Sequence, residues 1–176
     1  MTNRLLVPLS VILENSNIQG NAEPSTLAQA EREAMRIDLT GILGTNLFDL
    51  FANAVQADGT LSGISTIQAT FYSDHIVPLL SKQTEAVYMM TTHYQISNVG
   101  IQQTKSDNTA PASDSSVRDL HKRALNVVDE YASRAKAFIL AEGNETDLAD
   151  IYYQCPQNVR PQTKTGTSGI YTGRYR

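Results

Sequence analysis

The stretch from Ser65 to Tyr94 constrains the fold of this chain most strongly, because it predicts one long helix. Ser65 followed three residues later by Gln68 is the pattern of a capping box, which satisfies backbone N–H groups at a helix start. Beyond that start, apolar residues recur at helical spacing and lie on one stripe: Tyr72, Ile76, Leu79, Val87, Met90 and Tyr94. The polar Gln83 interrupts this stripe.

Pro78 stands inside this predicted helix. A proline there removes a backbone hydrogen bond and crowds the preceding turn, so we expect a kink near Asp74 within one continuous helix. A second periodic run is expected to form a long helix that begins at Ser116 and stops before Gly143. Its apolar residues step by three and four: Val117, Leu120, Ala124, Val127, Tyr131, Ala135 and Phe138. These two helices are the expected core.

The regions before the long helix are less regular. Residues 1–23 are expected to form an extended N-terminal arm, because Pro8 interrupts the apolar run Leu5–Leu13 and confines any strand there to a sheet edge. Pro24 suits the first turn of a helix, and the inner face of that helix would be Leu27, Ala30 and Ala34. Thr45 is the expected cap of a short helix, Asn46–Val55. Residues 24–155 would form the helical domain.

Two segments lack the helical period. Residues 94–115 connect the two long helices and predict a hairpin or extended arm followed by an exposed polar loop, a length that in compact domains usually indicates a binding loop or disorder. Residues 156–176 contain no long aliphatic block and predict a flexible, extended tail. The fold class is therefore mainly α: a helical bundle on two long helices, with an arm and a C-terminal tail.

Charge is divided unevenly along the chain. Residues 1–155 hold 10 Lys and Arg against all 18 Asp and Glu, a net charge of −8, whereas residues 156–176 hold four basic residues and no acid. The single cysteine, Cys155, excludes an internal disulfide, and no apolar run reaches the roughly 18 residues of a membrane span. We expect a protein made in a cytoplasm, with no membrane association.

The candidate chemical groups do not assemble into a recognisable catalytic or metal site. His75 and His93 share a helix face but are 18 residues, about 27 Å, apart. Cys155 has no histidine motif around it, and Asp147 and Asp150 have no companions that would complete an acid–base or metal site. Phosphate-loop, dinucleotide-binding and hydrolase motifs do not occur. We expect no enzyme activity, no cofactor and no bound metal.

Partner binding is the chemistry that the sequence favours. The tail combines basic and aromatic residues, the types enriched at interface hot spots, and four charges over 21 residues favour a protein over nucleic acid as its partner. The predicted partner-binding residues of the tail are Arg160, Lys164, Ile170, Tyr171, Arg174, Tyr175 and Arg176. Those of the arm are Ile96, Asn98, Val99, Gly100 and Ile101.

Over residues 25–153 the chain resembles the head–tail connector (adaptor) proteins of tailed bacteriophages, especially the ring proteins of crAss-like phages. Three pieces carry the resemblance: a helix entry at Ile42–Phe48, the proline-containing helix with Ile76–Leu79, and the Ser97–Ile101 stretch that precedes Ser106–Asn108, Ala112–Ser113 and the second long helix. The chain has Val99 where that family usually has a basic residue, and it lacks the tryptophan that family often has in the long helix.

The resemblance implies a virion protein without catalysis. It implies a ring, commonly a dodecamer, that is seated under the portal protein and bridges it to further connector or tail proteins while DNA passes through an axial channel. The acidic body would suit such a channel, since it repels a DNA backbone. Two alternatives stay open: a helical adaptor or regulatory protein that binds one protein partner through its basic tail, and an enzyme with an unrecognised helical site.

Overall fold

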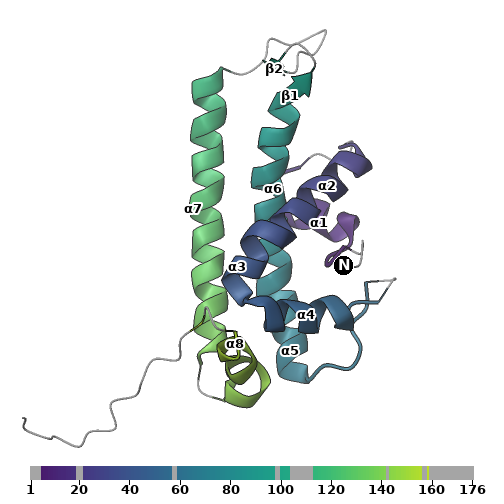
Figure 1. Ribbon diagram of the computed structural model, residues 1–176, viewed down its shortest axis with the longest axis vertical. Coiled ribbons are helices and arrows are strands. Elements are labelled where there is room, and N and C mark those ends of the chain that lie inside the picture. The colour runs from purple at the N-terminus through teal and green to yellow at the C-terminus, as the bar shows by residue number, and fades with distance from the viewer. Residues whose placement is uncertain are drawn as a thin grey trace, which may run out of the picture.

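A computed structural model of the chain describes residues 5–18, 22–56, 59–97, 100–103, 113–141, 143–155 and 158, and within them the fold is the predicted helical bundle (Figure 1). Two strands, β1 (Tyr94–Ser97) and β2 (Gly100–Gln103), form the only sheet of this described part. The helical elements are α1 (Leu9–Asn15), α2 (Pro24–Ala34), η1 (Met35–Leu39), α3 (Thr40–Leu43), α4 (Thr45–Ala54), α5 (Thr66–Phe71), η2 (Tyr72–Ile76), α6 (Val77–His93), α7 (Asp114–Ile139), η3 (Glu145–Ala149) and α8 (Asp150–Tyr153).

The predicted long helix is confirmed as the continuous run α5–η2–α6. Ser65 caps it: its hydroxyl accepts from the Gln68 N–H, and the Gln68 side chain accepts from the Ser65 N–H, which completes the capping box. The distortion expected near Asp74 takes the form of the π-helical segment η2, where the Val77 N–H bonds to the Tyr72 carbonyl. Pro78 has no N–H to donate, and the wider π-helical turn before it lets the helix continue through the proline.

α6 lies at the centre of the bundle, with α1 and α2 on one side and α7 on the other (Figure 1). The core is one apolar cluster in which Ile76, Leu79 and Leu80 of the η2–α6 run are fully buried. From α2, the predicted inner face of Leu27, Ala30 and Ala34 is confirmed as buried. α6 also buries four polar side chains with this core: Ser81, Gln83, Thr84 and Glu85.

The prediction of an extended N-terminal arm is wrong for its described part, because residues 9–15 form the helix α1. Pro8 stands immediately before the helix, where its missing N–H costs nothing and its carbonyl accepts from the N–H groups of Val11 and Ile12. Leu6, Val7 and Ile12 are buried in the same cluster as the residues of α6, so the apolar run Leu5–Leu13 is part of the core.

α7 begins at Asp114, which is earlier than the predicted start at Ser116. Its cap is Ser113, whose hydroxyl accepts from the Ser116 N–H at 3.3 Å. The predicted inner stripe is also partly wrong: Leu120 and Val127 are exposed, by 52% and 42%. The residues of α7 that are buried are Val117, Val128, Ala132, Ala135 and Ile139.

The cap of α4 also differs from the prediction. Gly44 precedes the helix with φ of +77°, and Thr45 is its first residue. A Cβ at Gly44 would lie 2.7 Å from Nδ2 of Asn158 and 3.1 Å from Cβ of Cys155. Glycine is therefore required both by the backbone angle and by the close approach of the chain that follows α8.

Candidate interaction surface

The described residues of the predicted arm, 94–97 and 100–103, form an antiparallel hairpin at the far tip of the α6–α7 pair (Figure 1). Ile96 pairs with Ile101 across the two strands, and Ser97 pairs with Gly100. Asn98 and Val99 lie outside the described residues. The hairpin follows α6 directly, since β1 begins at the residue after His93, so the tip is placed by the long helix itself.

The tail residues predicted to bind a partner lie outside the described part of the chain: Arg160, Lys164, Ile170, Tyr171, Arg174, Tyr175 and Arg176. The last described residue, Asn158, is held against the body. Its N–H donates to the Cys155 carbonyl at 2.9 Å, and its side-chain amide donates to the Tyr152 carbonyl at 3.0 Å. Asn158 therefore lies beside Gly44, at the junction of α3 and α4.

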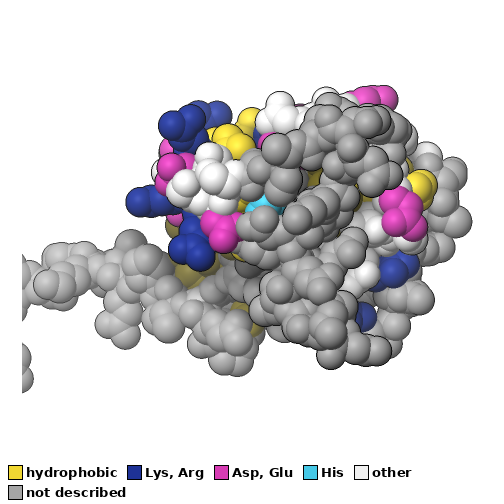
Figure 2. Space-filling view, turned by 90° about the horizontal axis from the view of Figure 1, so that it is seen from above, with side chains coloured by type: hydrophobic (Ala, Val, Ile, Leu, Met, Phe, Trp, Pro, Cys, Tyr) yellow, Lys and Arg dark blue, Asp and Glu magenta, His cyan; other side chains and the backbone are white. Residues whose placement is uncertain are grey.

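One flank of α7 presents apolar side chains to the outside, and we call Leu120, Val127 and Tyr131 the outer flank. Leu120 and Val127 are seven residues apart and Tyr131 is four further on, so all three lie on one side of the helix. Tyr131 is half-buried and has the Arg134 guanidinium 5.8 Å from its ring centroid. A view down on the hairpin tip shows basic and acidic side chains around hydrophobic ones at one side of the molecule (Figure 2).

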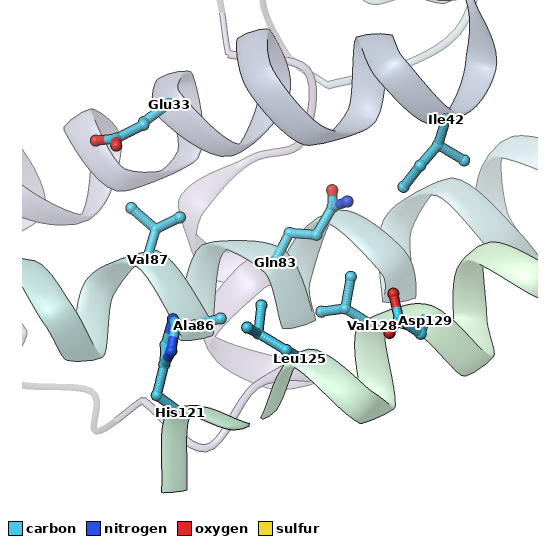
Figure 3. A pocket seen from close by; sticks show the side chains of 9 residues that line it. All are labelled: Glu33, Ile42, Gln83, Ala86, Val87, His121, Leu125, Val128 and Asp129. Atoms are coloured by element: carbon cyan, nitrogen blue, oxygen red, sulfur yellow. The ribbon is translucent and has the colours of Figure 1, made fainter. Parts of the chain in front are cut away.

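The opposite flank of α7 borders a groove of about 530 Å³ whose floor is α6 and whose other wall is α2 and α3 (Figure 3). Its apolar lining comes from α3, α6 and α7 and consists of Ile42, Ala86, Val87, Leu125 and Val128. Its polar lining consists of Glu33, Gln83, His121 and Asp129. One signal of this groove is visible in the sequence, namely the interruption of the apolar stripe by Gln83.

Gln83 lies on the floor of the groove with its amide directed between the two walls (Figure 3). The residue is 1% exposed, and neither its Oε1 nor its Nε2 has a hydrogen-bond partner in the described part of the chain. Leaving a buried amide unpaired costs roughly 1–3 kcal/mol for each group. A buried amide of this kind is explained either by a structural cost that the fold tolerates or by a ligand that completes it.

Gln83 is not alone in this, since Oε2 of Glu31, Nε of Arg32 and Oγ1 of Thr84 are also buried without a hydrogen-bond partner in the described part of the chain. Two other buried polar groups do have structural partners. Oε1 of Glu31, which is fully buried, accepts from the Val7 N–H at 3.0 Å, and the Tyr72 hydroxyl donates to the Leu6 carbonyl at 2.7 Å. Burial raises the pKa of Glu31 to about 7, although the N–H groups of Val7 and Leu6 and the charge of Arg32 act in the opposite direction. These bonds attach the segment before α1 to α2 and η2, which makes Glu31 a structural residue.

A second buried carboxylate ties down the segment after α1. Glu85 of α6 accepts from the N–H and the side-chain amide of Asn17, and it pairs with Lys82 at 2.9 Å. Desolvation acts to raise the pKa of Glu85, but these partners outweigh it, and the pKa falls below its ordinary value. Glu85 and Glu31 thus hold the segments on either side of α1.

The three histidines do not meet. His75 packs at a tilt against Phe71 and Phe138, with ring centroids 5.6 and 4.7 Å away, and burial lowers its pKa. Nε2 of His93 lies 3.5 Å from the Asp114 carboxylate, linking the end of α6 to the start of α7. His121 lines the groove. Among the described residues, no three His, Cys, Asp or Glu side chains are grouped to hold a metal ion.

Cys155 and the Asp147–Asp150 pair have structural surroundings. The Cys155 thiol is buried, 3.7 Å from the Thr45 hydroxyl. The Asp147 carbonyl accepts from the Gln68 side chain at 2.9 Å, which joins η3 to the start of the long helix. Across the described ranges, none of the helices is long and apolar enough to cross a bilayer.

Comparison with known proteins identifies a family but no individual relative. Residues 39–147 match a family of unknown function, DUF6712, and because this match spans more than half of the chain, the protein belongs to that family. The match extends from the end of η1 through the long helix, the hairpin and α7. No curated protein and no solved structure matches the chain.

Proposed function

We propose that this member of the DUF6712 family is a structural virion protein that forms a ring at the head–tail junction of a tailed bacteriophage. The ring, a dodecamer in the connectors that the chain resembles, would bridge the portal protein and further connector or tail proteins. DNA would pass through its axial channel without sequence-specific binding. The role is one of assembly, with no catalytic step and no cofactor.

The observation that carries this proposal is the one-sided packing of α7. One face of the helix is buried on α6, while Leu120 and Val127 on the outer flank are left exposed. Burying apolar area contributes about 25 cal/mol per Å², so an aligned apolar flank favours contact with another protein surface. A contact between the outer flank of one copy and a different face of the next is heterologous, and such contacts form a ring when the rotation between copies closes.

The hairpin and the tail would extend the assembly along the channel axis. The β1–β2 hairpin stands at the tip of the two longest helices, which makes a stiff support for reaching an adjacent subunit or the next ring (Figure 1). We assign Ile96, Gly100 and Ile101, with Asn98 and Val99 between the strands, to that contact. The tail, through Arg160, Lys164, Ile170, Tyr171, Arg174, Tyr175 and Arg176, would dock on the portal or the next connector layer.

The outer flank provides the test. Replacing Leu120→Glu together with Val127→Glu places two charges on it without touching the core, so the chain should fold and yet fail to enter particles. Leu140→Glu is the matched control, because Leu140 is also exposed, by 49%, but belongs to neither the outer flank nor the groove. Normal incorporation of the double variant would contradict the proposed role of this flank.

Deletion of residues 156–176 tests the tail separately. The apolar core described above lies before this segment, so the truncated chain should fold, with a small loss of stability from the missing Asn158 hydrogen bonds, yet it should no longer attach to its neighbouring ring. Unchanged attachment would exclude the tail as the docking element.

The divided charge favours a second candidate function, that of a helical adaptor which binds one protein partner through its basic tail and forms no ring. A net charge of −8 in residues 1–155 and +4 in the tail would let a single acidic partner select the tail. Mass measurement of the native complex separates the two functions, since a one-to-one complex supports the adaptor and a multiple of one chain supports the ring.

A further inference from the structure

The groove between α7 and the α2–α3 wall has the chemistry of a site for an extended peptide. Gln83 at its floor offers a donor group and an acceptor group, both without a partner in the described part of the chain. The backbone of an extended segment offers a C=O that can accept from the Gln83 amide N–H and an N–H that can donate to the Gln83 amide oxygen. The apolar side chains of Ile42, Val87 and Leu125 would pack against aliphatic parts of the same segment.

The negative charge of the groove favours a segment with a positive net charge. Glu33 on one wall and Asp129 on the other are its charged residues, and both are exposed at the rim. Neither carboxylate forms an ion pair within the described residues. A segment with basic residues and no acid would therefore be attracted, and an acidic one would be repelled.

The end of the described chain contacts the glycine that follows α3, a helix of the groove wall. Asn158 lies against Gly44, which is two residues from Ile42 in the groove wall. The 18 residues that follow, 159–176, carry Arg160, Lys164, Arg174 and Arg176 and no acid. At about 3.3 Å per residue they reach roughly 60 Å, which is ample to enter the groove from that end. Because the segment is part of the same chain, its effective concentration at the groove is near millimolar, which favours it over a free peptide.

We infer that, in the unassembled subunit, the groove lined by Gln83, Glu33 and Asp129 binds the chain's own basic C-terminal segment, residues 159–176. The inference goes beyond the ring proposed above and does not require it, since it concerns a single free chain. The groove would bind the chain's own segment, whereas the outer flank would bind a neighbouring copy. In an assembled particle, the same segment would have to leave the groove before it could bind a neighbouring protein.

Site-specific photo-crosslinking in the full-length chain tests this inference. The crosslinker p-benzoylphenylalanine replaces Leu125, which lines the groove and is 42% exposed, in an equal mixture of ¹⁴N- and ¹⁵N-labelled chains. We expect crosslinks to peptides from residues 159–176 in which both peptides carry the same label. The matched control places the crosslinker at Leu120, which lies on the outer flank of α7 with 52% exposure, and the yield there should be severalfold lower.

Charge and amide variants then test the recognition. Glu33→Gln with Asp129→Asn should lower the Leu125 crosslink severalfold, and Gln83→Leu should do so as well, while Asp119→Asn, an exposed acid outside the groove, should leave it unchanged. Raising the salt from 0.1 M to 1 M shortens the Debye length from about 10 Å to about 3 Å and should also weaken it. Circular dichroism checks that each variant is folded.

Three results would overturn the inference. Equal crosslinking from Leu125 and Leu120 would show that the segment has no preference for the groove. Crosslinks that join differently labelled chains would assign the segment to another copy. A yield unchanged by the charge and amide variants would show that Glu33, Asp129 and Gln83 do not bind it. None of these results depends on whether the chain forms a ring, which is tested by particle incorporation.

Discussion

The two long helices that the β1–β2 hairpin joins, α6 and α7, differ in their amphipathicity and in their surroundings: the apolar residues of α7 are much more confined to one side than those of α6. α6 is packed by α1, α2 and α7, and it buries polar residues as well as apolar ones. α7 is packed along one face and leaves Leu120 and Val127 exposed. The weaker amphipathicity of α6 fits a helix that is packed on several sides, and the stronger amphipathicity of α7 fits a helix that is packed along one face.

A matched pair of leucine truncations gives the largest expected difference between the helices. Leu79→Ala in α6 removes a fully buried side chain and should lower the free energy of unfolding by about 2–5 kcal/mol. Leu120→Ala in α7 should change it by less than about 0.5 kcal/mol, because the side chain is half exposed. Urea unfolding monitored by circular dichroism measures both values. Similar costs at the two sites would contradict the contrast.

The next expected effect is a pH dependence that arises from Glu31 of α2, which packs on α6. Its pKa is about 7 in the folded chain, against an ordinary value of 4.5, so the folded chain keeps a proton that the unfolded chain has already released. Stability should therefore fall as the pH rises from below the unfolded pKa through the folded one, by on the order of 2 kcal/mol between pH 5 and 8. Glu31→Gln should abolish this loss. Parallel stability–pH profiles for the two proteins would show that Glu31 does not titrate in this range.

The helix caps provide the smallest and most local comparison. Ser65→Ala removes the capping box of the run that leads into α6 and should cost about 1 kcal/mol of global stability. Ser113→Ala removes the cap of α7 at the exposed tip, where loss should appear mainly as faster amide exchange in the first turn. If Ser113→Ala lowered the free energy of unfolding more than Ser65→Ala, α7 rather than α6 would be the helix on which global stability depends more.

Much of the fold could be predicted because its local signals agree with its packing. The capping box at Ser65 follows from local chemistry and is confirmed. Near Asp74, where the sequence predicts a kink, the helix has a π-helical segment, and of the two alternatives for the segment after His93 the structure has the hairpin. The prediction around Pro8 is wrong because an apolar run with a proline fits an edge strand as well as a helix start. The choice between them depends on burial of the apolar residues around Pro8 in the shared core, which no local pattern reveals.

The face of α7 shows a second limit of prediction. Val127 and Val128 are adjacent apolar residues, so two registers of the stripe fit the sequence equally well, and packing on α6 selects the one that buries Val128. The burial of Glu31 and Glu85 could not be predicted, because their partners are 24 and 68 residues away in the chain. The predicted tail site and the Asn98–Val99 turn lie outside the described residues and stay predictions.

Symmetry-averaged electron microscopy of the native particle that contains this chain tests the central claim most directly. The account predicts a closed ring of copies around an axial channel, in which Leu120 and Val127 of α7 face the neighbouring copy and the tail reaches an adjoining ring. If the chain is absent from particles and is found free or bound one-to-one to another protein, the connector proposal is contradicted.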